Sequence, residues 1–71
     1  MTLDEAARRL AEMYHDPATG KVVSIHLFGI THADAIDGMS LEEVVVRAGL
    51  KKSYQTEVRK GMNLARYVSI K

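Results

Sequence analysis

The stretch from Glu42 to Met62, EEVVVRAGLKKSYQTEVRKGM, decides how the C-terminal half of this 71-residue chain is organised. An apolar helical pattern runs into Ala-Gly-Leu (48–50), a short basic break follows, and a second amphipathic segment begins near Ser53. Gly49 stands where a helix commonly ends in a left-handed residue. The stretch therefore predicts two helices joined by a turn.

Each of these two helices has an apolar face. Ser40 and Glu43 have the spacing of a capping box at the start of the first helix, whose apolar residues are Leu41, Val44, Val45 and Ala48. Ser53 is the expected N-cap of the second helix. On a helical wheel, one arc of that helix holds Tyr54, Val58, Gly61, Met62, Leu64, Ala65 and Val68, and the opposite arc holds Gln55, Thr56, Arg59, Lys60, Asn63, Arg66 and Tyr67.

Upstream, a first helix is predicted from a capping box formed by Thr2 and Glu5. Apolar residues recur at intervals of three and four and place one face on this helix, which should end near His15. The sequence Asp-Pro-Ala-Thr-Gly (16–20) is typical of a turn, because proline removes a backbone donor and glycine admits positive φ.

The segment KVVSIHLFGITHADAI (21–36) fits two interpretations. As a helix, it places Val22, Ile25, Gly29, Ala33 and Ile36 on one side, with Gly29 permitting a close helix crossing. As a strand over residues 21–28, it alternates apolar residues with Ser24 and His26, and its β-branched content favours this locally. A lone strand needs a partner, and only residues 67–70 resemble one. We therefore favour the helix.

Together these elements predict a single all-α domain over residues 1–71, built from about four short helices. The composition, 46% hydrophobic and 27% charged, is that of a globular protein. The chain has no cysteine, which fits a reducing compartment, and no targeting peptide is visible, so we expect a cytoplasmic protein. The longest apolar stretch, residues 22–30, is too short to cross a bilayer, and no membrane association is expected.

Charge is unevenly distributed along the chain. Residues 1–46 contain three Lys or Arg against eight Asp or Glu, whereas residues 47–71 contain seven against Glu57 alone. Such asymmetry indicates either a surface for a polyanion on the basic half or complementary charge in self-association.

The phrase LEEVVVRAGLKKSYQTEVRKG (41–61) resembles the helix-turn-helix core of small bacterial DNA-binding proteins, over about residues 40–69. Val45, Gly49 and Leu50 have the typical spacing: a packed side chain, a glycine that turns the chain, and an apolar plug. IHLFGITHADAI followed by SYQTEVRKGM is also similar to uncharacterised bacterial proteins described as helix-turn-helix-like. One departure stands out, since Gln55 occupies a position that usually holds a buried aliphatic residue. Either Tyr54 takes over that packing, or the turn is longer than standard.

The resemblance implies a recognition helix over residues 53–69 that lies in the major groove of DNA. By position, the residues that would face bases are Ser53, Gln55, Thr56 and Arg59, and those that would contact phosphate are Lys51, Lys52, Lys60 and Arg66. Gln can pair with adenine and Arg with guanine through two hydrogen bonds. The resemblance thus implies a DNA-binding protein, with transcription regulation as its role. A homodimer is expected on functional grounds, because one short helix contacts few base pairs.

Other functions have weaker support in the sequence. We found no pairing of a nucleophile with a general base and no phosphate-binding glycine loop, so no enzymatic activity, cofactor or small-molecule ligand is expected. His26 and His32 are six residues apart, which separates them on a helix, and no metal site is expected. The alternative function is a protein-interaction module that keeps the helix-turn-helix core without binding DNA, because the segment Val22 to Ile30 would be apolar on more than one side.

Overall fold

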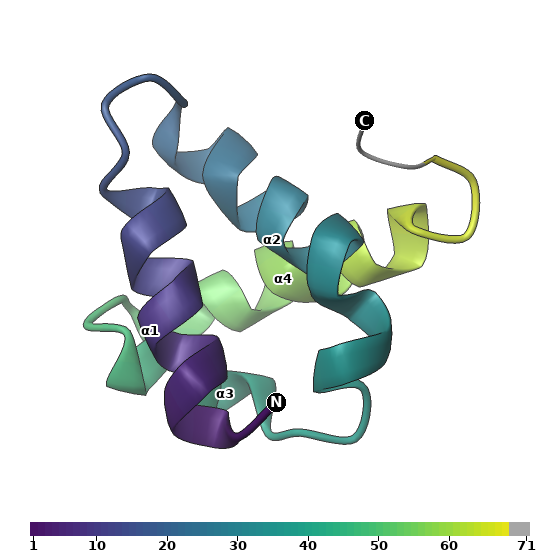
Figure 1. Cartoon of the computed structure of the whole chain (residues 1–71), viewed down its shortest axis with the longest axis horizontal. Coiled ribbons are helices and arrows are strands. Elements are labelled where there is room, and N and C mark those ends of the chain that lie inside the picture. The colour runs from purple at the N-terminus through teal and green to yellow at the C-terminus, as the bar shows by residue number, and fades with distance from the viewer. Residues whose placement is uncertain (69–71) are drawn as a thin grey trace.

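The structure is a computed structural model, and it describes residues 1–68 (Figure 1). This part of the chain forms α1 (Leu3–Tyr14), α2 (Lys21–Ile36), α3 (Leu41–Arg47), the 3-10 helix η1 (Lys52–Tyr54) and α4 (Gln55–Leu64). The predicted all-α fold is confirmed, and no strand occurs among the described residues. None of these helices is long and apolar enough to cross a membrane.

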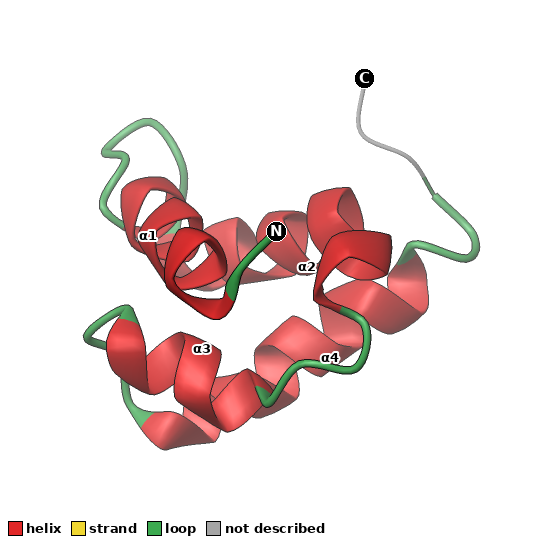
Figure 2. Ribbon diagram, turned by 60° about the horizontal axis from the view of Figure 1, so that its bottom comes forward, coloured by secondary structure: helices red, strands yellow, loops and turns green. Residues whose placement is uncertain are grey.

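The helices pack in two pairs. In Figure 2, α1 and α2 lie above α3 and α4. Contacts between helices are most extensive where α2 crosses α4, and α1 packs against both α2 and α3. The core between them is formed by buried side chains from all four helices, among them Leu10, Ile25, Phe28, Ile36, Val44, Val45, Val58 and Met62.

The segment from Lys21 to Ile36 is helical, so the alternative of a strand over residues 21–28 is wrong. Its buried residues follow a helical spacing: Ser24, Ile25, Phe28, Gly29 and Ile36. Packing this face against α1 and α4 outweighs the local preference of β-branched residues for strands. The helix is kinked at His32, whose backbone angles are not helical.

Helix starts follow the predicted capping in two places. The Thr2 hydroxyl accepts a hydrogen bond from the Glu5 amide, and the Glu5 carboxylate accepts one from the Thr2 amide, which completes the capping box of α1. At α3, the Ser40 hydroxyl accepts from the Glu43 amide. The Glu43 carboxylate instead lies 3.6 Å from the Arg47 guanidinium, so only one half of that predicted box forms.

The turn after α3 is a Schellman motif centred on Gly49, which has a φ of 85°. The Leu50 amide donates to the Val45 carbonyl at 2.9 Å, and the Gly49 amide donates to the Val46 carbonyl at 3.0 Å. Leu50 is half-buried against the core. The predicted roles of Val45, Gly49 and Leu50 are confirmed.

The bounds of the second helix of this unit differ from those predicted. Residues 52–54 form η1, α4 begins at Gln55, and Ser53 does not cap it. Tyr54 packs against the core. Four residues, 48–51, separate α3 from η1, which runs directly into α4, and Tyr54 supplies the packing that Gln55, itself half-buried, does not.

The helix α4 also ends earlier than predicted, at Leu64 rather than residue 69. Residue 69 itself lies outside the described residues. The Tyr67 amide bonds to the Leu64 carbonyl in a tighter turn, and Leu64 and Val68 are exposed. Because no apolar residue from 63 to 68 is buried, packing over this stretch does not sustain further helical turns.

Candidate nucleic-acid interface

The position of α4 is fixed by a close crossing with α2. A Cβ added to Gly29 would lie 2.5 Å from the Val58 carbonyl oxygen and 2.9 Å from Cα of Gly61. The backbones of the two helices therefore touch where both residues lack a side chain. This contact holds the glycine side of α4 against the protein and leaves its other side exposed.

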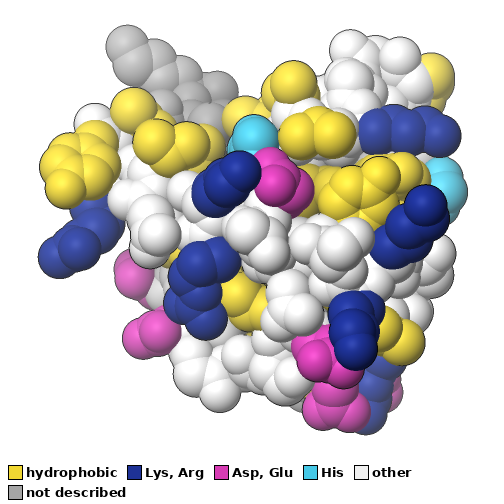
Figure 3. Space-filling model, turned by 180° about the vertical axis from the view of Figure 1, so that it is seen from behind, with side chains coloured by type: hydrophobic (Ala, Val, Ile, Leu, Met, Phe, Trp, Pro, Cys, Tyr) yellow, Lys and Arg dark blue, Asp and Glu magenta, His cyan; other side chains and the backbone are white. Residues whose placement is uncertain are grey.

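The exposed side of α4 and η1 carries the residues that the sequence assigned to DNA. We call the set the basic face, and it comprises Lys51, Lys52, Ser53, Gln55, Thr56, Arg59, Lys60 and Arg66. All are exposed except Gln55, which is half-buried. Figure 3 views the side of the molecule on which α4 lies and shows dark blue Lys and Arg side chains spread over it, with magenta Asp or Glu side chains beside some of them.

The residues of the basic face come from three local structures. Lys52 and Ser53 belong to η1, with Lys51 directly before it, and Gln55, Thr56, Arg59 and Lys60 belong to α4. Arg66 lies in the turn that follows α4 rather than on the helix. The basic face is thus longer than one helix.

Three of the four residues predicted to face bases lie together. Gln55, Thr56 and Arg59 line one wall of an open groove of about 490 Å³, while Ser53 is not part of its lining. The opposite wall is the start of α3 and includes Glu42. Glu42 was not predicted at this groove, although packing of α3 on α4 in a helix-turn-helix unit brings the first turns of both helices together.

The acidic residue of α4, Glu57, is bound to two neighbours. Its Oε1 lies 2.7 Å from Nε2 of His26 on α2, and its Oε2 accepts a hydrogen bond from Nζ of Lys60 at 3.3 Å. The hydrogen bond with His26, followed by that with Lys60, holds the pKa of the Glu57 carboxyl below its ordinary value. The carboxylate therefore stays ionised, and its charge offsets that of Lys60 at the edge of the basic face.

The pairing of His26 with Glu57 was not predicted, because the residues are 31 positions apart and on different helices. The only signal in the sequence was that Glu57 is the single acidic residue after Arg47.

Arg47 itself is engaged elsewhere: its guanidinium lies 2.7 Å from the Asp4 carboxylate and 3.6 Å from that of Glu43. Arg47 therefore ties α3 to α1 and is not part of the basic face.

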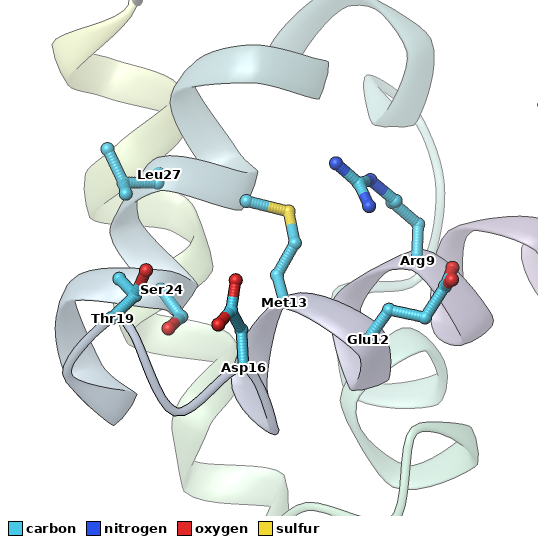
Figure 4. A pocket seen from close by; sticks show the side chains of 7 residues that line it. All are labelled: Arg9, Glu12, Met13, Asp16, Thr19, Ser24 and Leu27. Atoms are coloured by element: carbon cyan, nitrogen blue, oxygen red, sulfur yellow. The ribbon is translucent and has the colours of Figure 1, made fainter.

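A separate cavity of about 160 Å³ lies between α1 and α2, and Figure 4 shows its lining: Arg9, Glu12, Met13, Asp16, Thr19, Ser24 and Leu27. Its volume is about half the lower limit typical of small-molecule sites. The Ser24 hydroxyl donates to the Gly20 carbonyl at 2.8 Å.

Within residues 1–68, His, Asp and Glu side chains do not gather into a group of three that could hold a metal ion.

The model of a protein family described as "HTH-like domain" matches residues 2–71. The chain belongs to this HTH-like domain family. The match covers almost the whole sequence, more than the residues 40–69 that carried the resemblance. No curated protein and no solved structure matches the chain.

Proposed function

We propose that this HTH-like domain protein binds duplex DNA through the basic face, with α4 in the major groove. The order α3, turn, α4 supports the proposal, because in helix-turn-helix proteins the second helix enters the groove and its N-terminal residues contact base edges. The N-terminal half of α4 carries Gln55, Thr56 and Arg59, which lie together on one groove wall.

In this proposal the residues of the basic face have two roles. Ser53, Gln55, Thr56 and Arg59 contact bases, since Gln can recognise adenine and Arg guanine in two-point fashion. Lys51, Lys52, Lys60 and Arg66 contact phosphates, and the release of counterions from DNA favours these contacts whatever the sequence. Regulation of transcription is the process such a protein would serve.

The observation that carries the proposal is the orientation of α4. Its glycine side is packed on α2, and the exposed side presents Lys and Arg without an acidic residue in the row Lys52, Thr56, Arg59, Asn63 and Arg66. Glu57 lies outside this row, beside His26.

Binding of the protein to mixed-sequence duplex DNA, measured by fluorescence anisotropy at two salt concentrations, tests the proposal. Four phosphate contacts predict that a fourfold rise in salt weakens binding by about 100-fold. For variants that remove a positive charge from the basic face, the charge-matched control is Arg8→Ala, which removes one exposed positive charge from α1. Absence of binding at the lower salt concentration would contradict the proposal, because electrostatic attraction is strongest there.

A second candidate function is the protein-interaction module, favoured by the exposure of Val22 and Val23. These residues open α2 and are 45% and 54% exposed. Exposed neighbouring apolar residues are common in interaction surfaces when they form a continuous patch. A protein that binds no duplex at low salt, and whose partner binding is lost in Val23→Ser, would have this function instead.

A further inference from the structure

The end of α4 and the turn after it expose several apolar side chains. Tyr67 is 82% exposed, more than any other large hydrophobic residue described, and Leu64 and Val68 are 44% and 48% exposed. In Figure 3, yellow side chains gather at the upper left of the molecule, next to the grey atoms. Contact of these apolar side chains with water is unfavourable, so burying them against another molecule would be favourable.

A groove lies beside these side chains. It measures about 470 Å³ and separates the second half of α2 from the turn after α4. Apolar residues in its lining are Ile30, Ala33, Ala35, Ala65 and Val68, and the polar residues are Thr31 and Asp34. Asp34 is the charged residue of this lining. The groove is wide enough to take a large side chain, because the alanines that line it have small side chains.

Opposite charges flank the apolar residues. Asp34 lines the groove, and Arg66 precedes the exposed Tyr67. Both are exposed, and neither takes part in an ion pair or side-chain hydrogen bond within residues 1–68. One end of the molecule thus presents a protruding aromatic residue with a positive charge beside a groove that carries both apolar side chains and a negative charge.

We propose that this surface pairs with a second copy of the chain. Tyr67 of each protomer enters the groove of the other, and Arg66 lies against the partner's Asp34. A two-fold dimer requires a patch that is complementary to itself, and this patch contains both the protruding group and the groove. The charges occur twice in such a dimer, and each pair joins unlike signs.

The size of the patch sets the strength of the pairing. Stable complexes bury about 800 Å² per partner, and an aromatic side chain contributes about 150–250 Å² of buried surface. Tyr67, with the smaller contributions of Leu64, Val68 and the groove walls, falls at or below this standard size. The dimer is therefore weak, with a dissociation constant in the micromolar range.

The position of this surface leaves the base-facing residues free, although Arg66 then pairs with Asp34 and is no longer available to phosphate. Ser53 and Gln55 lie at the opposite end of η1 and α4 from Tyr67, so a dimer keeps both sets of base-facing residues exposed. This consequence rests on the proposed function, whereas the pairing itself does not. Self-association measured without DNA therefore fails or succeeds independently of DNA binding.

Sedimentation of the full chain from low micromolar to near-millimolar concentration, with two charge-reversal variants, tests the interface. Asp34→Arg and Arg66→Asp each place like charges together twice in a homodimer, so each should weaken self-association by at least about tenfold. An equimolar mixture restores both pairings of unlike sign. The mixture should therefore form a heterodimer at concentrations where either variant alone is monomeric.

Two further variants complete the test. Tyr67→Ser should abolish dimerisation, while Val46→Ser, which removes an exposed apolar side chain from α3, should leave it unchanged. Circular dichroism checks that every variant is folded. A wild-type chain that stays monomeric at the highest concentration, or a mixture no more dimeric than its two components, would overturn the interface.

Discussion

Gly29 of α2 and Gly61 of α4 face each other at the crossing of their helices. A Cβ added to Gly61 would lie 3.0 Å from Cα of Gly29 and closer still to the His26 carbonyl oxygen, which belongs to rigid helical backbone. The crossing therefore has no room for a methyl group on either helix. It sets how α4 is held, and with it which side of α4 faces solvent.

Gly61→Ala should consequently destabilise the fold, by about 1–3 kcal/mol or more, because overpacking forces the backbones apart. Urea unfolding monitored by circular dichroism measures the loss. Gly20→Ala is the control, since its added Cβ would come no closer than 3.7 Å to another atom, and its cost should stay below about 1 kcal/mol. Equal stability of Gly61→Ala and the wild type would show that the helices can separate without cost.

The turn residue Gly49 should respond differently. Its φ of 85° is unfavourable for a side chain, but nothing lies within 4 Å of an added Cβ. Gly49→Ala should therefore cost only the backbone strain of a left-handed residue, about 1–2 kcal/mol. Gly49→Asn should cost less, because asparagine tolerates this conformation better. A larger loss in the asparagine variant, in the same unfolding assay, would contradict this account of the turn.

The hydrogen bond between His26 and Glu57 predicts a dependence of stability on pH. The folded state lowers the pKa of Glu57 below its ordinary value of 4.5. The pair therefore stabilises the fold above that value, and its contribution is lost as the pH falls through the folded-state pKa. Thermal unfolding of Glu57→Gln should show a lower melting temperature than the wild type near neutral pH, and the difference should vanish in strong acid.

A constant difference between Glu57→Gln and the wild type across the acidic range would mean that shape, not charge, explains the effect. Lys60→Gln gives a second check, because it removes the weaker neighbour of Glu57 and leaves the 2.7 Å contact with His26. Its melting temperature should change less than that of Glu57→Gln.

His32 should contribute a second dependence on pH. Burial, followed by the nearby charge of Arg9, lowers the pKa of its ring, and its Nε2 is buried without a hydrogen-bond partner in the described residues. The neutral ring is favoured on folding, so this contribution is present above the ordinary pKa of about 6.5 and is lost as the pH falls toward the folded-state value. His32→Leu should flatten the stability profile between those values, and an unchanged slope would contradict this assignment.

The local features of this fold could be predicted from sequence, and the long-range contacts could not. The Thr2 capping box, the turn at Gly49 and the apolar faces depend on residues a few positions apart, which follow helical spacing. The end of α4 was misplaced because the wheel assigned Leu64 and Val68 to the apolar arc without information on what they contact. The hydrogen bond of Glu57 with His26 depends on the crossing of α2 and α4, which spacing along the chain does not reveal.

In the candidate site too, local features could be predicted from the sequence and long-range contacts could not. The resemblance to a helix-turn-helix grouped Ser53, Gln55, Thr56 and Arg59, and the last three line one groove in the structure, whereas Ser53 does not. The presence of Glu42 on the facing wall, and of Arg66 beyond the helix, follows only from the packing of α3 on α4 and from where α4 ends.

The two classes of proposed DNA contact predict different effects on binding. Arg59→Ala should weaken binding to a preferred duplex by about 1–3 kcal/mol and reduce the preference for that sequence, because a base contact is lost. Lys52→Ala should weaken binding to all duplexes similarly and reduce the slope of log affinity against log salt by about 1. Anisotropy titrations on a selected duplex and a mixed one, at several salt concentrations, separate these outcomes. Arg8→Ala removes the same charge from α1, so its salt slope should match the wild type. If Arg8→Ala and Lys52→Ala weaken binding equally, overall charge rather than the basic face explains the affinity, and α4 is not the recognition helix.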